Sequence, residues 1–253
     1  MTKEEMYIED LIILGTACPE PMRDGRTSVC VAGYSHKHGF IRVYPSSVDM
    51  KLKMWSIVKI PLEKNPQDTR FESWKIQGSK HEWDHLYEKI EFVGNYKKKY
   101  RRDLISNLEV GCVNNLNDQN KSLGIVKPKI NDYFFVKNEE YSPNNQVDLY
   151  GMKELKTRKN HRFIPRVKYF CRDCQVKTIH HQQIVEWGFY EWIRKYPDRK
   201  NQVWDNAKFN SKKHDIYFLV GNIFKHRKSF IVISVIRLPK LDSAQKTLFP
   251  LKK

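Results

Sequence analysis

The chain has 253 residues, of which 40% are hydrophobic and 13% aromatic, a composition that excludes a disordered protein. Its 46 Lys and Arg against 29 Asp and Glu give a formal net charge of +17, so DNA or another polyanion is the expected partner. No apolar run is long enough to cross a bilayer, and acidic residues precede the short apolar run near the N-terminus. We therefore expect a soluble, cytoplasmic protein with no membrane partner.

The first part of the chain predicts mainly strands. Residues 27–34 and 39–44 are rich in β-branched and apolar residues, and the polar turn between them predicts a hairpin that Pro45 ends. Further elements are predicted in this order: strands over 54–62 and 70–77, a helix and a short strand over 80–93, and a short helix over 101–109.

The second part predicts a helix and a final hairpin. The elements expected there are a strand over 133–137, a long exposed loop over 138–163, a strand over 165–171, a helix-like pattern over 180–196, and strands over 214–222 and 229–238. We expect the final hairpin to join the sheet of the first part. The prediction is an α+β fold, a mostly antiparallel β-sheet or partly open barrel with a few helices packed on it. One domain would cover residues 1–240, followed by a flexible tail over 241–253.

Two segments combine cations with aromatic rings. Five cations and two tyrosines fall within residues 95–102, and residues 153–172 carry eight Lys or Arg against one Glu. Cations neutralise phosphates and rings stack on unpaired bases, although a solvated charged face has the same composition. The candidate nucleic-acid-binding residues are Tyr96, Lys97, Lys98, Lys99, Tyr100, Arg101, Arg102, Lys159, Arg162, Arg166 and Lys168.

A C-x-x-C pair indicates a possible metal site. Cys171 and Cys174 fit two thiolate ligands on one turn, and His180 is a candidate third ligand for zinc. No fourth ligand lies nearby in the sequence, so two ordinary cysteines at a strand end are the alternative. Cys112 stands beside apolar residues and is expected to fill the core. The sequence therefore predicts no cofactor, and zinc is the one alternative.

Carboxylates supply the candidate catalytic residues. Period-two spacing places Asp68, Arg70 and Glu72 on one face of a strand, where one carboxylate could act as an acid or base. The alternative is a salt-bridged strand face. Glu186 lies on a mostly apolar helix pattern and is the second candidate, unless it is a buried structural residue. The candidate substrate-binding residues are Arg70, Glu72, His36 and Asn222, the last two at strand ends.

The C-terminal tail carries a short pattern of its own. Gln245 is followed by Leu248 and Phe249, which resembles the clamp-binding peptide of bacterial DNA repair and replication proteins. A sliding clamp is therefore a possible partner. A tail strand packed on the core is the alternative.

Several segments together resemble one known family. They are Thr16–Pro21, Val29–Gly33, Gly39–Pro45, Asp68–Ser73 and Phe218–Asn222. They resemble a family of small prokaryotic proteins that includes a phage-defence DNA glycosylase of the Brig type. Met22 departs from the family pattern, where a Ser follows the Pro, and the C-x-x-C region is variable. The resemblance implies excision of a modified base from DNA but assigns no catalytic residue here.

The sequence thus favours a DNA glycosylase that flips and excises a base, with Asp68 or Glu186 stabilising the charge that develops on the sugar. A non-catalytic DNA- or RNA-binding module needs only the basic and aromatic residues. A metal-dependent nuclease would need a cluster of acidic residues that the sequence does not display.

Overall fold

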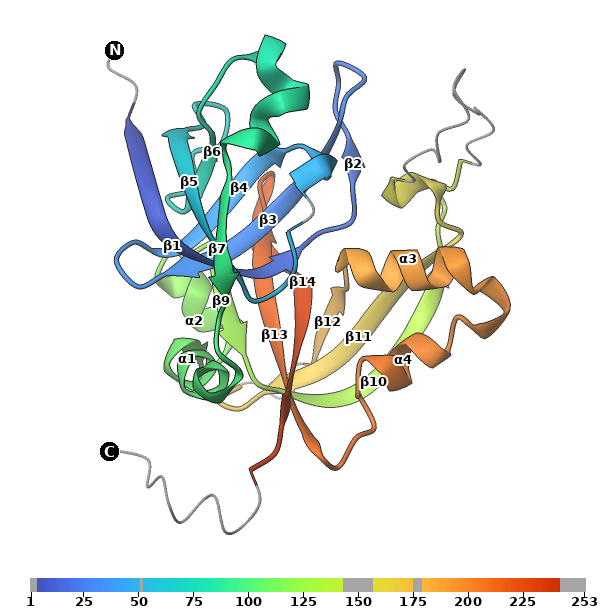
Figure 1. Cartoon of the computed structure of the whole chain (residues 1–253). Coiled ribbons are helices and arrows are strands. Elements are labelled where there is room, and N and C mark those ends of the chain that lie inside the picture. The colour runs from blue at the N-terminus through green and yellow to red at the C-terminus, as the bar shows by residue number, and fades with distance from the viewer. Residues whose placement is uncertain (1–3, 51, 143–156, 175–178, 242–253) are drawn as a thin grey trace.

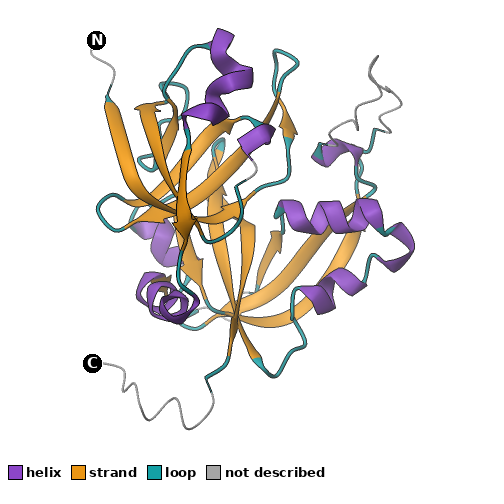
Figure 2. Ribbon diagram, in the orientation of Figure 1, coloured by secondary structure: helices purple, strands orange, loops and turns teal. Residues whose placement is uncertain are grey.

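The computed structural model describes residues 4–50, 52–142, 157–174 and 179–241. The fold is α+β and mostly β, as the sequence predicted, with short helices around strongly curved sheets (Figures 1 and 2). Of the described helices, none has the length and apolar character needed to cross a membrane.

The first half of the chain forms a closed barrel of five strands. The strands of this half are β1 (Glu5–Thr16), β2 (Glu20–Pro21), β3 (Thr27–Ser35), β4 (Gly39–Ser46), β5 (Ser56–Lys64), β6 (Ser73–Ile76) and β7 (Glu91–Asn95), of which β2 and β7 lie outside the ring. The barrel runs in the order β1-β3-β4-β6-β5, and β5 pairs again with β1. Only the β4–β6 pair is parallel within this ring. This order is that of an OB-type Greek-key barrel.

Strand β1 closes this first barrel because it pairs on both edges. The register shifts between Ile13 and Gly15 on the β3 side and between Ile8 and Leu11 on the β5 side. Such irregularities bend a strand and increase its twist, which lets one strand serve two neighbours. The helices of this half are η1 (Val48–Met50), η2 (Lys80–Lys89), η3 (Lys98–Tyr100) and α1 (Arg101–Leu108).

The second half repeats the same strand order. Its elements are β8 (Glu109–Val110), α2 (Val113–Asp118), β9 (Leu123–Val126), β10 (Pro128–Lys137), η4 (Arg158–Asn160), β11 (Phe163–Cys171), β12 (His180–Gln183), α3 (Trp187–Lys195), η5 (Pro197–Arg199), α4 (Gln202–Asn206), β13 (His214–Ile223) and β14 (His226–Pro239). One sheet runs β10-β11-β12 and the other β14-β13-β9-β8. Ile184, directly after β12, joins them through a parallel bridge to Val232 of β14. With β9 and β10 as one bent first strand, this is a second OB-type barrel.

The two barrels share an apolar core. Ile12 and Leu14 of β1 and Ala32 of β3 lie in one buried cluster with Leu219 of β13 and Ile233 of β14. The outer face of β3 and β4 is therefore covered by the second barrel, and β1 packs beside β14 (Figure 1). Residues of both barrels build this cluster, so the core is continuous across the junction, and the single domain over residues 1–240 stays a prediction.

Several sequence predictions need correction. The pattern over 180–196 is not one helix, since β12 and α3 divide it. The final hairpin pairs with β9 and β8 and not with the sheet of the first half. Strand β4 continues past Pro45 to Ser46, and β6 begins only at Ser73. Strands β1 and β9 and helix α2 were not predicted. The other predicted strands and the helix at 101–109 are confirmed within a few residues.

Candidate nucleic-acid interface and metal cluster

A buried ion pair lies in the turn before β6. Arg70 donates from Nε to both carboxylate oxygens of Asp68, at 2.9 and 3.1 Å, and Ser73 Oγ donates to Asp68 at 2.8 Å. The Nη1 of Arg70 donates to the backbone oxygen of Asn222, at the end of β13, at 2.8 Å. Asp68 and Arg70 are 5% and 7% exposed. The pair therefore ties the first barrel to the second.

Glu72 makes a second connection between the barrels. Its carboxylate accepts hydrogen bonds from the backbone N–H and the hydroxyl of Ser122, at 2.9 and 2.7 Å. The backbone oxygen of Ser122 in turn accepts from Arg42 Nη2 at 3.0 Å and from the backbone N–H of Asn222 at 3.0 Å. Ser122 precedes β9. A single residue of the second barrel therefore forms hydrogen bonds with both Glu72 and Arg42 of the first barrel.

Asp68, Arg70 and Glu72 are all buried, but they lie in the turn before β6 and not on the strand face that their spacing predicted. Phe71 between them is 82% exposed. Burial by itself would raise the pKa of Asp68, but the hydrogen bonds and charge of Arg70 outweigh it and lower that pKa below its usual value. A carboxylate held in this way favours the structural alternative over catalysis. Asn222 is also buried and is a member of the same network.

Glu186 lies elsewhere, beside a cavity of about 360 Å³. It directly precedes α3 and accepts hydrogen bonds from the backbone N–H of Val235 at 2.6 Å and from Arg237 Nη2 at 2.9 Å. Thr16 and Trp187 also line the cavity. The buried Nε1 of Trp187 has no hydrogen-bond partner in the described part of the chain. The structure thus does not bring the two candidate catalytic carboxylates together.

The sheet β10-β11-β12 carries cations and rings on its outer face. Arg166 and Lys168 alternate along β11 with Val167 and Tyr169, which are fully buried in the second barrel. Phe134 of β10 lies opposite Arg166 in the strand register. On the other edge, His181 of β12 lies opposite Lys168. We call these four residues, Phe134, Arg166, Lys168 and His181, the outer face.

The members of the outer face contact one another. The Nζ of Lys168 lies 5.1 Å from the centre of the Phe134 ring, and the rings of Phe134 and His181 are 5.5 Å apart. Burial lowers the pKa of His181, and the charges of Arg166 and Lys168 lower it further. None of the four residues belongs to a hydrophobic core cluster. The face is therefore a surface of mixed positive and aromatic character.

The other predicted nucleic-acid-binding residues fall into two groups. Those exposed to solvent are Lys97, Lys98, Lys99, Tyr100, Lys159 and Arg162. Tyr96, Arg101 and Arg102 instead help to pack α1 on the barrels. Tyr96 stacks on Trp55, Arg101 lies 4.7 Å from the centre of the same indole, and Arg102 forms an ion pair with Asp215 at 2.8 Å.

His36 lies apart from the buried network. Its backbone N–H donates to Asp10, and its exposed ring contacts Tyr34 and Tyr96. The predicted clamp-binding residues Gln245, Leu248 and Phe249 lie outside the described residues.

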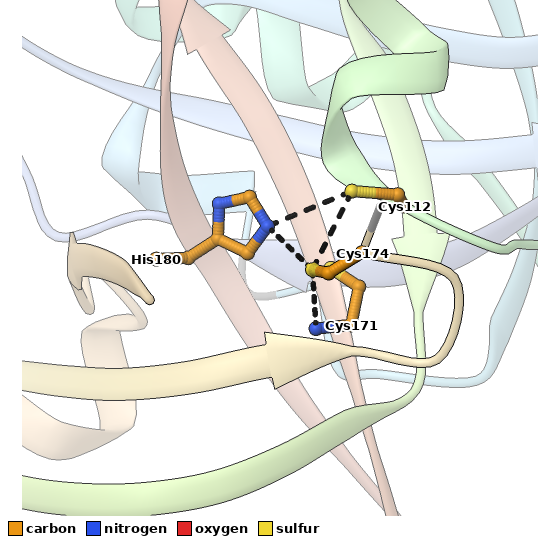
Figure 3. Close-up of side chains that lie close together, drawn as sticks. All are labelled: Cys112, Cys171, Cys174 and His180. Atoms are coloured by element: carbon orange, nitrogen blue, oxygen red, sulfur yellow. Dashed lines mark hydrogen bonds between the residues drawn. The ribbon is translucent and has the colours of Figure 1, made fainter. Parts of the chain in front are cut away.

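Four potential metal ligands converge beside β11. The Sγ atoms of Cys112, Cys171 and Cys174 and a ring nitrogen of His180 all lie within 4.8 Å of one another (Figure 3). Cys112, directly before α2, had been expected to fill the core. It is buried, but it supplies the fourth ligand that the local sequence lacks. In the described part of the chain this is the only such group of His, Cys, Asp and Glu, and it contains no carboxylate.

Comparison with known families divides the chain where the two barrels meet. A model described as a domain of unknown function, DUF8757, matches residues 110–251, more than half of the chain. The protein belongs to the DUF8757 family. A second domain of unknown function, DUF8758, matches residues 8–107, the first barrel. None of the curated proteins compared with the chain matches it. The resemblance to the family of the phage-defence glycosylase stays a prediction.

The ion pair of Asp68 and Arg70 predicts a large loss of stability on mutation. Replacing Asp68 by Asn leaves the Arg70 guanidinium buried without its counter-charge, which costs about 3–5 kcal/mol of unfolding free energy. Chemical denaturation of both proteins measures the difference. Asp24→Asn, which removes an exposed pair with Arg26, is the matched control and should leave stability unchanged. An Asp68→Asn protein of native stability would contradict the structural role.

The same pair predicts a dependence on pH. The pKa of Asp68 is lowered in the folded protein, so its contribution is complete above about pH 4, where the unfolded carboxyl is ionised, and is lost as pH falls through the lowered value. The stability difference between the natural protein and Asp68→Asn should therefore shrink in acid. Denaturation curves at neutral and at strongly acidic pH test this, and a constant difference would refute it.

Proposed function

We propose that the protein binds nucleic acid, and that the outer face of the second barrel contacts the unpaired bases and phosphates. One observation carries the proposal. Arg166 and Lys168 stand in cross-strand register with the rings of Phe134 and His181, on a sheet face where Arg166 and Lys168 are partly exposed. Cations attract the phosphates, and rings provide stacking platforms for bases.

The position of this face in the fold supports the proposal. In OB-type barrels the second and third strands form the surface that binds oligonucleotides, which is an analogy of fold and not of sequence. In the first barrel those strands are β3 and β4, where Ala32 and Arg42 are buried against the second barrel. In the second barrel they are β11 and β12, whose outer side chains belong to no core. Among the described residues, Arg166 and Lys168 of the second surface are partly exposed, whereas Ala32 and Arg42 of the first are buried.

The net charge of the chain adds a sequence-independent attraction. The exposed Lys97–Lys99 segment and the pair Lys159 and Arg162 add further positive charge to the surface. Binding should therefore weaken with salt, as phosphate contacts release counterions. DNA is the proposed ligand, and RNA of the same sequence is the comparison that tests the choice.

Removing the two cations of the outer face should weaken binding and reduce its salt dependence. For Arg166→Ala/Lys168→Ala, the slope of log K against log salt on single-stranded DNA should fall by about 0.7 per residue. Fluorescence anisotropy over a salt series measures it. Lys80→Ala/Lys195→Ala removes the same charge from exposed helical positions of both halves and is the control. If both double variants lost the same affinity and the same salt slope, the outer face would contribute only its charge and no specific contact.

Removing the ring of Phe134 should weaken binding at constant charge. We expect a loss of about 1–3 kcal/mol for Phe134→Ala on single-stranded DNA, with little change in salt slope. Phe134→Tyr should retain affinity, because the stacking surface remains. Phe92→Ala, at an exposed ring on β7 of the first barrel, is the matched control. If Phe134→Ala bound with full affinity, Phe134 would not be part of the nucleic-acid interface.

Base excision is the second candidate function, and the cavity beside Glu186 favours it. Glu186 and Trp187 both line this cavity, and the buried indole N–H of Trp187 lacks a partner in the described part of the chain. A carboxylate at such a site can stabilise the positive charge that develops on a sugar as its base leaves. The donors from Val235 and Arg237 hold the carboxylate in place.

Base excision predicts abasic sites that depend on Glu186. The protein would be incubated with plain, deaminated, alkylated and phage-modified DNA in EDTA, and abasic sites revealed by alkali. Glu186→Gln should abolish strand breaks while DNA affinity and melting temperature stay close to native. Binding without breaks on every substrate would leave nucleic-acid binding as the function and eliminate excision of these bases.

A further inference from the structure

We propose that Cys112, Cys171, Cys174 and His180 bind one structural zinc ion. Three sulfurs and one imidazole nitrogen come together from three separate segments: the start of α2, the turn after β11 and the start of β12 (Figure 3). This inference is independent of the proposed nucleic-acid binding.

The distances between the ligand atoms fit a tetrahedral ion. With Zn–S of about 2.3 Å and Zn–N of about 2.0–2.1 Å, tetrahedral geometry places two sulfurs about 3.8 Å apart and a sulfur and a nitrogen about 3.5 Å apart. Cys112 Sγ and Cys174 Sγ are separated by 3.7 Å. The Nε2 of His180 lies 3.6 Å from Cys112 Sγ and 3.3 Å from Cys174 Sγ. One ion at the centre would contact all of these atoms.

The chemistry of the ligands selects the metal. Three thiolates and an imidazole suit zinc, whereas magnesium and calcium prefer oxygen ligands. On binding, the three thiols release their protons to solvent. The backbone N–H of Cys171 lies 3.1 Å from Cys174 Sγ, and the N–H of Val113 interacts with the sulfur of Cys171. Such N–H groups stabilise a thiolate ligand and fix its orientation.

The number and burial of the ligands indicate a structural role. Four protein ligands complete a tetrahedron and leave no position for water or substrate. Cys112 and Cys171 are buried. Gly111 allows the segment that carries Cys112 to lie close to the turn after Cys171, because a Cβ at position 111 would lie 1.9 Å from a carboxylate oxygen of Asp173 in that turn. The N–H of Asp173 also donates to the backbone oxygen of Gly111 at 3.0 Å.

The ion would fix the sheet that carries the outer face. Cys171 ends β11 and His180 begins β12, so the metal closes the connection between these two strands. His180 and His181 are consecutive in a strand and therefore point to opposite faces. One contributes to the cluster and the other to the outer face.

Metal analysis of the full-length protein tests the proposal. We expect one zinc per chain after purification with reductant and dialysis, and a cobalt-substituted form with the thiolate-to-cobalt absorption of a tetrahedral site. Cys112→Ser and Cys174→Ser should lose the zinc, whereas Cys30→Ser, outside the cluster, should retain it. His180→Cys preserves four ligands and should also retain it.

The natural protein provides a test that does not require a variant to fold. A strong chelator should lower its melting temperature, and added zinc should restore it. Full-length protein that lacks zinc after reconstitution, or that melts identically with and without chelator, would overturn the proposal. So would retention of one zinc by Cys112→Ser, or a disulfide between Cys112 and Cys174 in protein reduced and supplied with zinc.

Discussion

The arrangement of the two barrels depends on one buried polar network. Asp68, Arg70, Glu72 and Arg42 are charged groups removed from water, and each is compensated by a partner across or beside the junction. Burying such groups without partners would cost several kcal/mol, so the network is stable only when the barrels are joined in this orientation. Apolar contacts around Leu219 and Ile233 supply the driving force for association, whereas the network determines its geometry.

This junction also determines which surface is left for a ligand. The two barrels have the same topology and therefore two equivalent faces. In the first barrel this face is buried in the junction, because Arg42 of β4 donates to Ser122 of the second barrel. The corresponding strands of the second barrel present Arg166 and Lys168 to solvent instead. The same fold position therefore carries a structural role in the first half and a candidate binding role in the second. The chemistry of the outward side chains makes the difference.

The sequence predicted the fold class and most strands, because period-two patterning and turn residues are local signals. It did not reveal β1, whose bulges break the alternation, or the repeated barrel, because strand order depends on contacts distant in sequence. The candidate site shows the same division. Arg166 and Lys168 could be found from composition, and Cys171, Cys174 and His180 from spacing. Cys112 lies 62 residues before Cys174, so only the fold shows that it belongs to the cluster.

The position of Asp68 illustrates a more general limit of reading carboxylates from sequence. Alternating Asp, Arg and Glu at spacing two satisfies the pattern of a catalytic face and equally that of a buried junction. The deciding property is what surrounds the oxygens: those of Asp68 are occupied by Arg70 and Ser73, whereas the carboxylate of Glu186 borders a cavity. The exposure of Phe71, between two buried charges, follows from the same alternation. Arg70 and Glu72, on either side of Phe71, are held by hydrogen bonds to the second barrel. The same hydrogen bonds therefore join the barrels and keep the Phe71 ring exposed.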